Sequence, residues 1–544
     1  MASAVSQPDP TQETQHHPNR DEKEIYEQVQ DADTTVAEDA SMRDPEKAIK
    51  SPASSANSTH SDQRTLSNSS QPGDGQQADP DIVDWDGPDD PENPLNWPAK
   101  KKWMLIANVS FMTLISPAAS SFFAPGVPQV MRAFHETSSL IGAFVVSVYV
   151  LGFAFGPMLI APLSELYGRS ILYHAGSILF VIFSIACAVS DSMGMLIAFR
   201  FLAGCAGSTP LTIGGGSVAD MFPVQERAGA MAIWAMGALI GPVVGPIGGG
   251  YLVERLVWRW VFWILAIAGG VASITFLFVG HETYHPVLLE RKTKALIKST
   301  GNTNLRSKLA KDLPPKKVFA QAIVRPMKML FLSPIVFLMC LYVSLNYGIL
   351  YLFFTTITFV FERQYHFSSG SVGLAYLGIG IGMAIGLASL GIWSDKFVIK
   401  HQKKGNLKPE HRLPIQLTLP GAVLLPIGVI IYGWTTQHKV HWIVPIMSMS
   451  FIGLGNLTCL MTAQTYLVDA FTIHAASAMA ANTILRSIFG GVLPLAGLPM
   501  FNQLGLGWGN TLLGLIALAF IPVPILFRYY GERIRTNPKF QVQL

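Results

Sequence analysis

Two arginines lie inside long apolar runs of the sequence, where a charged side chain has strong chemical consequences. Arg200 stands in the run LIAFRFLAGCAG, and Arg486 stands in ANTILRSIFGG. A charge at the centre of a bilayer costs about 2.5–3.5 kcal/mol on insertion scales unless it is paired or faces a cavity. Each arginine therefore needs a partner or a function.

For Arg200 we predict a functional role. A fixed positive charge beside a cavity lowers the pKa of a nearby carboxylate, or orders waters that pass a proton. The alternative is a structural arginine that bonds backbone carbonyls or reaches the membrane interface. For Arg486 the structural alternative is favoured, because it follows Asn482 on the same helix face and can bond the backbone of a neighbouring helix.

Charged residues at the ends of the apolar runs could form a latch. Glu165, Arg169 and Asp220 are expected at the cytosolic ends of predicted helices 2, 3 and 4, where a carboxylate–arginine pair can form in one conformation and separate in another. Asp395 is expected to serve similarly in the second half. Asp220, titrating against Arg200 or Arg169, is the predicted proton-coupling acid, and His174 and Glu254 are the less favoured alternatives. The alternative is that these are interfacial charges satisfied by water.

A stripe of small residues marks one predicted helix. Four glycines recur at every fourth position: Gly237, Gly241, Gly245 and Gly249. On a helix they form one flat face on which another backbone can lie closely. Pro242 and Pro246 each remove a backbone donor and bend the helix, which is tolerated where neighbouring groups satisfy the freed carbonyls. A kinked, closely packed helix suits a part that rocks against its neighbour; the alternative is a generic packing face.

Aromatic and amide side chains on three predicted helices could line a substrate pocket. They are Trp234, Asn346, Tyr347, Tyr351, Asn456 and Gln464. Aromatic rings with a few amides suit bulky apolar organic molecules that carry scattered polar groups. The alternative is that the aromatic residues serve only helix packing.

The composition excludes several classes of protein. Half of the residues are hydrophobic and only 14% are charged, which predicts a membrane protein. The four cysteines fall in apolar segments without metal-like spacing, so we expect no disulfide and no metal site. The sequence has no Walker loop, which argues against ATP-driven transport, and no His/Asp/Glu cluster at catalytic spacing, which argues against an enzyme.

Twelve apolar runs of roughly 20 residues, each long enough to cross a bilayer, position these side chains. We place them at 103–124, 139–161, 170–190, 194–217, 228–250, 258–280, 332–356, 370–393, 413–434, 440–464, 477–500 and 507–528. The predicted organisation is all-α, in this order: a disordered acidic tail (1–80), a juxtamembrane collar (81–102), a six-helix bundle (103–280), a basic loop (281–331), a second six-helix bundle (332–528) and a C-terminal tail (529–544).

The distribution of basic residues predicts the topology. The loop 281–331 carries eleven Lys and Arg residues and the segment 394–412 carries six, whereas the loops on the opposite side carry five in total. Basic residues favour the cytosolic side, so both termini are expected in the cytosol.

An internal repeat supports two similar halves. Gly152, Gly156 and Ser164-Glu165 are matched 230 residues later by Gly382, Gly386 and Ser394-Asp395. A weaker echo pairs the segment Asp220-Met221-Phe222 with Asp469-Ala470-Phe471, 249 residues later. Two similar six-helix halves around a central site are the architecture of secondary transporters.

Several motifs resemble one family. The segment GPMLIAPLSELYGR (156–169) resembles the loop between helices 2 and 3 of the major facilitator superfamily, and Arg200 matches its helix-4 arginine pattern. The glycine-proline stretch 237–250 resembles the helix-5 motif of its proton-linked antiporters. The segments DPENPLNW, WRWVFW, ETYHPVLLERK and LNYGILYLFF are similar to fungal members of the twelve-helix drug:proton antiporters. This resemblance implies the major facilitator fold, with two pseudo-symmetric bundles of six helices.

The combined expectation is a proton-coupled exporter of small organic compounds such as drugs, toxins or secondary metabolites. The alternatives are a polyamine or other small-solute transporter on the same fold, and a non-transporting membrane sensor. We expect a monomer in the fungal plasma membrane, with the vacuolar membrane as the alternative site. The expected partners are a small-molecule substrate, the proton and the lipid bilayer; no cofactor and no nucleic acid is expected.

Overall fold

The computed structural model describes residues 81–223, 226–310, 314–402 and 408–537. The side chains of residues 394–402 are outside this description, as are those of residues 315 and 473. The predicted disordered tail, residues 1–80, also lies outside the described residues.

The first half consists of helices that follow the predicted apolar runs. They are α2 (Ala99–Ser121), α3 (Val127–Ala133), α4 (Ser139–Tyr167), α5 (Arg169–Ala188), α6 (Met193–Gly207), α7 (Thr209–Met221), α8 (Arg227–Arg255) and α9 (Arg259–Val279). The short turn η2 (Ala124–Gly126) connects α2 to α3. α6 and α7 together make one span of 29 residues, Met193–Met221.

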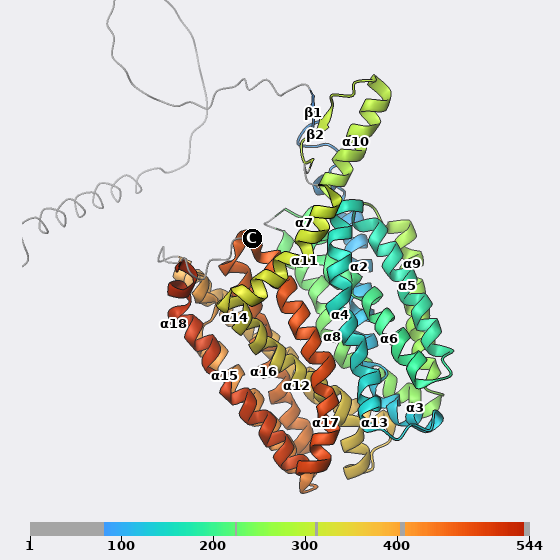
Figure 1. The fold of residues 1–544 in the computed structure, drawn as a ribbon, viewed down its shortest axis with the longest axis vertical. Coiled ribbons are helices and arrows are strands. Elements are labelled where there is room, and N and C mark those ends of the chain that lie inside the picture. Colours follow the sequence, from blue (N-terminus) through green and yellow to red (C-terminus); the bar gives the residue numbers. More distant parts are fainter. Residues whose placement is uncertain (1–80, 224–225, 311–313, 403–407, 538–544) are drawn as a thin grey trace, which may run out of the picture. The chain divides into compact units, whose positions relative to one another are not determined.

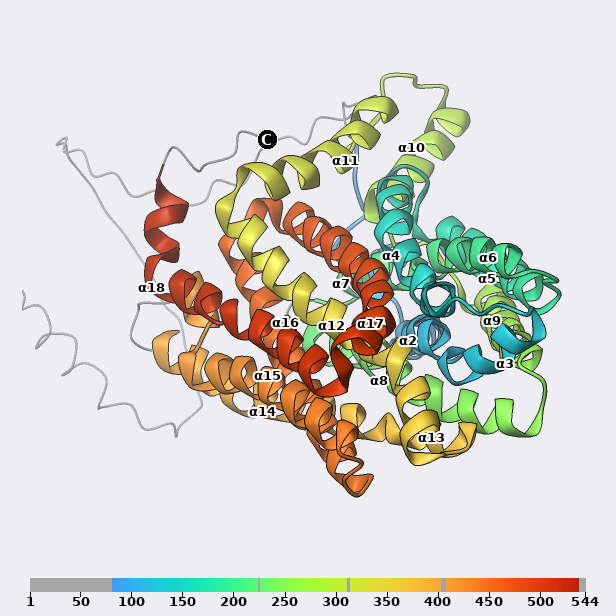
Figure 2. The same ribbon diagram turned by 60° about the horizontal axis from the view of Figure 1, so that its bottom comes forward.

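The second half has a similar series of helices. After the connecting helices α10 (His285–Thr300) and α11 (Pro315–Leu332) come α12 (Pro334–Tyr365), α13 (Ser369–Ala375), α14 (Leu377–Gln402), α15 (Ile415–Gln437), α16 (Ile443–Ala470), α17 (Ala475–Ala519) and α18 (Pro522–Thr536). α10 projects from one end of the bundle and α13 lies at the other, so we name the two ends after them (Figure 1). Figure 2 shows the two groups of helices side by side.

Eleven continuous stretches in the described part of the chain are long and apolar enough to cross a membrane. The last of them, Ala475–Thr536, has 62 residues, about three times the roughly 20 that one crossing needs. The helical path breaks within it at Gly505, which adopts φ 77° and ψ 166°. Two crossings in this stretch are consistent with the predicted total of twelve.

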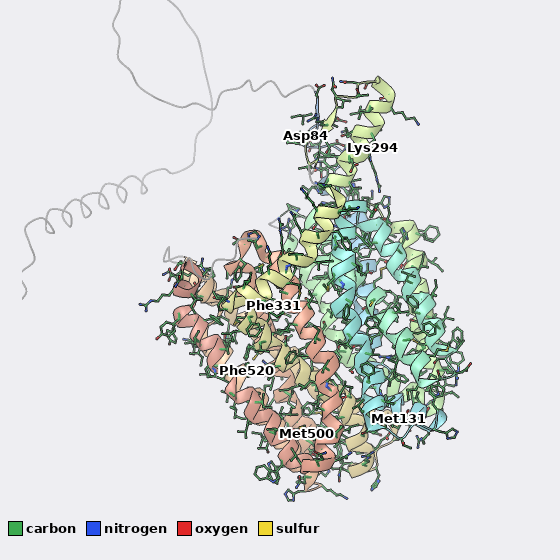
Figure 3. The ribbon with its side chains drawn as sticks, in the orientation of Figure 1. Asp84, Met131, Lys294, Phe331, Met500 and Phe520 are labelled. Carbon is green, nitrogen blue, oxygen red and sulfur yellow. The ribbon has the colours of Figure 1, made fainter. Side chains whose placement is uncertain are left out.

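The surface of the bundle is apolar and its projecting part is charged. Leu277 and Phe278, near the end of α9, are 65% and 80% exposed. Figure 3 shows Phe331, Phe520, Met131 and Met500 on the bundle, whereas Asp84 and Lys294 lie on the projecting part. This distribution suits a bundle surrounded by lipid with α10 in water.

The glycine stripe of α8 lies on the backbone of α2. A Cβ at Gly237 would lie 2.7 Å from the carbonyl oxygen of Ser110, one at Gly241 2.8 Å from that of Leu114, and one at Gly245 2.8 Å from that of Ala118. Gly249 meets the carbonyl of Phe122 in the same register. Both partners advance four residues at a time in the same direction, so the helices run parallel with their backbones in contact. Close Cα–H···O contacts of this kind stabilise helix pairs.

α2 also satisfies a carbonyl that a proline leaves free. Pro246 has no N–H, so the carbonyl of Pro242, four residues earlier, loses its helical donor. The hydroxyl of Ser121 donates a hydrogen bond to this carbonyl at 3.0 Å. The stripe thus joins two helices of the same half. The two halves do not meet at this stripe. A helix that rocks against the other half would have its closely packed face at that interface.

The collar segment is held against α10 at the projecting end. Strand β1 (Ile82–Val83) pairs in parallel with β2 (Arg306–Ser307). The buried carboxylate of Asp90 accepts hydrogen bonds from the backbone N–H groups of Asp86 and Glu92 and from Lys292 Nζ at 3.0 Å. These bonds hold the pKa of Asp90 below its ordinary value, and the bond from the N–H of Asp86 has the largest effect. Burial of the carboxylate acts in the opposite direction and raises its pKa.

We expect the collar to loosen in acid. A carboxylate whose pKa is lower in the folded protein stabilises the fold above the unfolded pKa of about 4, and this contribution is lost as the pH falls through the folded pKa. Hydrogen exchange of the amides of Asp86 and Glu92, corrected for intrinsic rates, should therefore accelerate in acid. Asp90→Asn should show fast exchange already at neutral pH. Exchange that is equally slow in both proteins at every pH would contradict the assignment.

Candidate functional site

The α10 end of the first half holds an ion pair between two predicted residues. Arg169 begins α5 and Asp220 lies in the last turn of α7, and Arg169 Nε is 2.5 Å from Asp220 Oδ2. A second bond joins Arg169 Nη2 to Asp220 Oδ1 at 3.3 Å, so the contact is bidentate. The side chains are only 15% and 14% exposed, and Thr283 Oγ1 donates to Asp220 Oδ2 at 3.1 Å. Screening by water is therefore weaker than at an open surface.

A residue that the sequence analysis did not single out, Glu282, binds the start of α5. Its buried carboxylate accepts the backbone N–H of Arg169 at 2.9 Å and that of Ser170 at 3.1 Å. The N–H groups of Thr283 and Tyr284 bond the same carboxylate. The first N–H groups of a helix have no partner within the helix and favour a negative charge. Glu282 thereby fixes the linker after α9 beside the Arg169–Asp220 pair.

Gly168 shows how closely this linker packs. It adopts φ 99°, and a Cβ there would collide with the carboxylate of Glu282. We expect Gly168→Ala to lower stability by about 1–3 kcal/mol, because a side chain is strained at this backbone conformation. The midpoint of thermal unfolding of the purified protein should fall, whereas Gly194→Ala, with nothing within 4 Å, should leave it unchanged. Equal midpoints for the two variants would be evidence against this packing.

The second half has a matching ion pair. Arg412 Nε lies 2.6 Å from Asp469 Oδ2, and Asp469 ends α16 much as Asp220 ends α7. These are the two aspartates paired by the weaker sequence echo. Asp395 lies in α14, but its side chain is outside the described part, and Glu165 is exposed in the last turn of α4. The sequence analysis missed Arg412 and Asp469 as a pair.

Arg200 is enclosed by aromatic rings. Its guanidinium carbon lies 5.1, 5.4 and 5.7 Å from the ring centres of Phe123, Tyr149 and Phe262, and the residue is 1% exposed. Its Nη2 donates to the carbonyls of Ser120 at 3.3 Å and Val146 at 3.4 Å. In this conformation Arg200 makes the carbonyl bonds of the structural alternative, and its role in transport stays a prediction.

Arg486 makes different contacts. It is half-buried on α17, and its guanidinium carbon lies 4.8 Å from the ring centre of Tyr347 on α12. Among the described residues no hydrogen-bond partner is found for its buried Nε. The sequence analysis favoured carbonyl bonds for Arg486 rather than for Arg200, so the contacts are distributed in the reverse way.

The predicted substrate residues fall into separate groups. Tyr347 and Tyr351 lie together, with ring centres 4.8 Å apart. Asn456 Nδ2 donates to the carbonyl of Asn346 at 2.7 Å, which joins α16 to α12. Trp234 Nε1 donates to the carbonyl of Pro210 at 3.2 Å and so ties α8 to α7. Gln464 is half-buried on α16.

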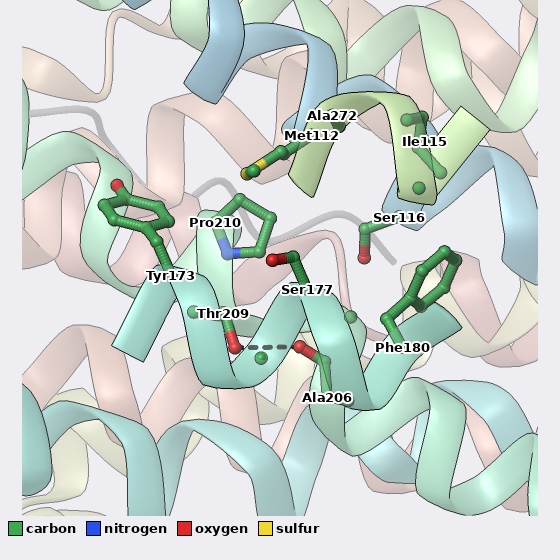
Figure 4. Close-up of a pocket in the computed structure, with 13 residues that line it drawn as sticks. Met112, Ile115, Ser116, Tyr173, Ser177, Phe180, Ala206, Thr209, Pro210 and Ala272 are labelled. Carbon is green, nitrogen blue, oxygen red and sulfur yellow. Dashed lines mark hydrogen bonds between the residues drawn. The ribbon is translucent and has the colours of Figure 1, made fainter. Parts of the chain in front are cut away.

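Two cavities are lined by residues other than these. One of about 30 Å³ lies in the first half, and Figure 4 shows Ser116, Tyr173 and Pro210 around it. It is far smaller than the about 300–1,000 Å³ of pockets that bind organic ligands. A larger one of about 260 Å³ lies near the α13 end and is lined by Phe359, Val360, Arg363, Gln364, Gln437, Leu498, Phe501, Asn502, Gly505 and Leu506. No predicted substrate residue lines either cavity.

The two halves meet closely at the α13 end. A Cβ at Gly250 on α8 would lie 2.5 Å from the carbonyl oxygen of Ser369, at the start of α13. The N–H of Gly370 donates to Glu254 Oε2 at 3.0 Å. Towards the middle, Ser147 on α4 donates to the carbonyl of Gly491 on α17 at 2.8 Å. Backbone contact leaves no space for a substrate to pass between α8 and α13.

The fold and site define a class of protein, the multi-pass membrane transporters built from two similar helical halves. The sequence model of the Major Facilitator Superfamily matches residues 109–494 of the chain. The chain belongs to this superfamily.

Relatives in fungi match nearly the whole chain. The MFS-type transporter penM of Penicillium rubens is 56% identical over 465 residues, which are 85% of this chain and 91% of the relative. The efflux pump radE of Floropilus chiversii is 50% identical over 472 residues, covering 86% of this chain and 87% of the relative.

Solved structures share the fold at low sequence identity. An inward-facing, unoccupied bacterial homologue of the human lysosomal transporter Spinster matches with a TM-score of 0.59 and 14% identity, over 82% of this chain and all of that chain. A D-xylose–proton symporter matches with a TM-score of 0.56 and 14% identity, over 78% of this chain and 98% of that chain.

Proposed function

We propose that the protein is a proton-coupled exporter of small organic compounds, such as secondary metabolites, drugs or toxins, that works by alternating access. The observation that carries the mechanism is the backbone contact between Gly250 on α8 and Ser369, which brings the two halves together at the α13 end. The 50% identity to a relative named as an efflux pump supports the direction of transport.

The orientation follows from the basic residues at the α10 end. The α10 end faces the cytosol and the α13 end faces outward. Contact between α8 and α13 is therefore contact at the outer end, and we assign the described conformation to the part of the cycle in which this end is closed. The Arg169–Asp220 and Arg412–Asp469 pairs lie at that side and rearrange when it closes.

Proton coupling is assigned to the Arg169–Asp220 pair. Protonation of Asp220 removes the charge that holds Arg169, so uptake of a proton weakens the pair in one conformation more than in the other. The protein acts as a monomer in the plasma membrane with both termini cytosolic. A polyamine substrate is disfavoured, because a polycation needs carboxylates and the middles of the described spans carry arginines instead.

Resistance in yeast tests this function. A strain that lacks its own efflux pumps should, on expressing the protein, grow in the presence of part of a panel of toxic organic compounds and accumulate less of them. The protection should be stronger at acidic than at neutral external pH, because inward proton flow drives export. Unchanged accumulation of every compound would contradict an exporter, and protection that is independent of pH would contradict proton coupling.

A further inference from the structure

Arg486 is a membrane-embedded cation for which no ion pair is found in the part of the chain that the structure describes. Helices α12 and α4 both pack against α17, and Tyr347 of α12 is the aromatic ring that Arg486 faces. The only carboxylates in these two helices are Glu362 and Glu165, both near helix ends. Glu362 is 15 residues from Tyr347, about 22 Å along the helix. α17 itself carries no Asp or Glu.

The ring contact does not offset the cost of this charge. The gain from a cation over an aromatic ring is smaller than the cost of an arginine at mid-membrane that is neither paired nor facing a cavity. A structural role would require bonds to carbonyls or a carboxylate, as Arg200 has with Ser120 and Val146. For Arg486 no such bond is found among the described residues.

A second polar side chain close to Arg486 also has hydrogen-bonding groups without partners in the described structure. Asn482 precedes Arg486 by one helical turn, so the two share a face of α17. Asn482 is 0% exposed, and neither its amide nitrogen nor its oxygen has a hydrogen-bond partner in the described structure. An unsatisfied buried amide destabilises the fold, because it has lost its hydrogen bonds to water. Two neighbouring side chains thus offer donors that a bound molecule can complete.

These residues lie where the two halves meet. One turn beyond Arg486, a Cβ at Gly490 would lie 2.9 Å from the ring of Tyr347 and 3.1 Å from Val150 of α4. Tyr347 packs on Tyr351, whose hydroxyl lies 3.0 Å from Ser120 Oγ on α2. A ligand beside Arg486 would therefore contact the seam whose two sides separate in alternating access.

We propose that Arg486, Asn482 and Tyr347 form a subsite for an organic anion, and that the exported compounds carry an ionised carboxylate or similarly acidic group. The planar guanidinium binds a carboxylate through two parallel hydrogen bonds. The amide of Asn482 donates to the same group, and the ring of Tyr347 packs against the apolar body of the compound. This inference rests on the proposed export of organic compounds and specifies their charge.

Paired probes test the subsite in the purified full-length protein. The probes are 1-naphthoate and its neutral analogue 1-naphthamide, and binding is followed by tryptophan fluorescence. Arg486→Gln should weaken naphthoate binding about 10-fold or more, since a hydrogen bond to a charged group is worth about 1.5–3 kcal/mol. Naphthamide binding should stay the same. Arg486→Lys should fall between, because it keeps the charge without the planar fork.

The control replaces another arginine that lies over an aromatic ring, at a different place in the fold. Arg259 lies over the ring of Trp258 at 4.5 Å, outside the seam, so Arg259→Gln should bind both probes as the wild type does. Equal naphthoate affinity in wild type and Arg486→Gln, loss of both probes in Arg486→Gln, or no binding to the wild type would each overturn the subsite. Absence of efflux in the yeast panel, with Arg486-dependent naphthoate binding intact, would instead overturn the exporter assignment alone.

Discussion

Gly245→Leu should reach the membrane and transport nothing. Even a Cβ at this position would lie 2.7 Å from Ser121 Oγ and 2.8 Å from the carbonyl oxygen of Ala118, and leucine adds three further carbons. Because the obstacle is backbone, α8 and α2 must separate, and the hydrogen bond from Ser121 to Pro242 breaks with them. Overpacking of this kind costs about 1–3 kcal/mol or more.

Efflux from cells measures the effect of Gly245→Leu on transport. The yield of folded protein measures its effect on folding. We expect efflux at background and a lower unfolding midpoint, with protein still present in the membrane. Gly270→Leu is the matched control, because Gly270 lies in the membrane helix α9 with nothing within 4 Å of its Cβ position. Normal efflux by Gly245→Leu, or equal damage from Gly270→Leu, would show that the close α8–α2 contact is not required.

Asp220→Asn should have the second largest effect. The change keeps the shape of the side chain and removes the charge that pairs with the guanidinium of Arg169, which is mostly buried. Breaking a charged, hydrogen-bonded pair costs about 1.5–3 kcal/mol, so we expect transport to fall at least about 10-fold. Asp469→Asn should do less, because the Arg412–Asp469 pair is 29% and 36% exposed and more strongly screened.

A double variant distinguishes the pair from its separate residues. Arg169→Gln combined with Asp220→Asn replaces both charges by neutral groups that can still hydrogen-bond. If the loss comes from an uncompensated charge, the double variant should transport better than Asp220→Asn alone. Additive losses in initial efflux rate would indicate that each residue acts independently, and the latch would then be wrong.

Local patterns in the sequence predicted the helices and the face on which α8 packs. The apolar runs required only length and composition, and the four-residue glycine spacing required only helical periodicity. The partner of that face could not be predicted, because Ser110 to Phe122 are more than a hundred residues away in the chain. Their carbonyls present no distinctive side-chain pattern.

The site was predicted less completely for the same reason. Arg169 and Asp220 were chosen as charges at helix ends, and the fold brings them together. Glu282 was overlooked because a carboxylate that caps a helix 113 residues earlier in the chain has no local signature. Arg412 and Asp469 had only a faint repeat to indicate them, since pseudo-symmetric halves diverge in sequence while they keep their geometry.

The most direct test of alternating access measures distances across both ends of the protein in a lipid bilayer. Spin labels on Leu140 and Leu504 report the α13 end, and labels on Tyr167 and Thr472 report the α10 end; all four positions are exposed. On addition of an exported compound, we predict that the Leu140–Leu504 distance increases while the Tyr167–Thr472 distance decreases. Distances that stay fixed at both ends, or that increase together, would contradict the account.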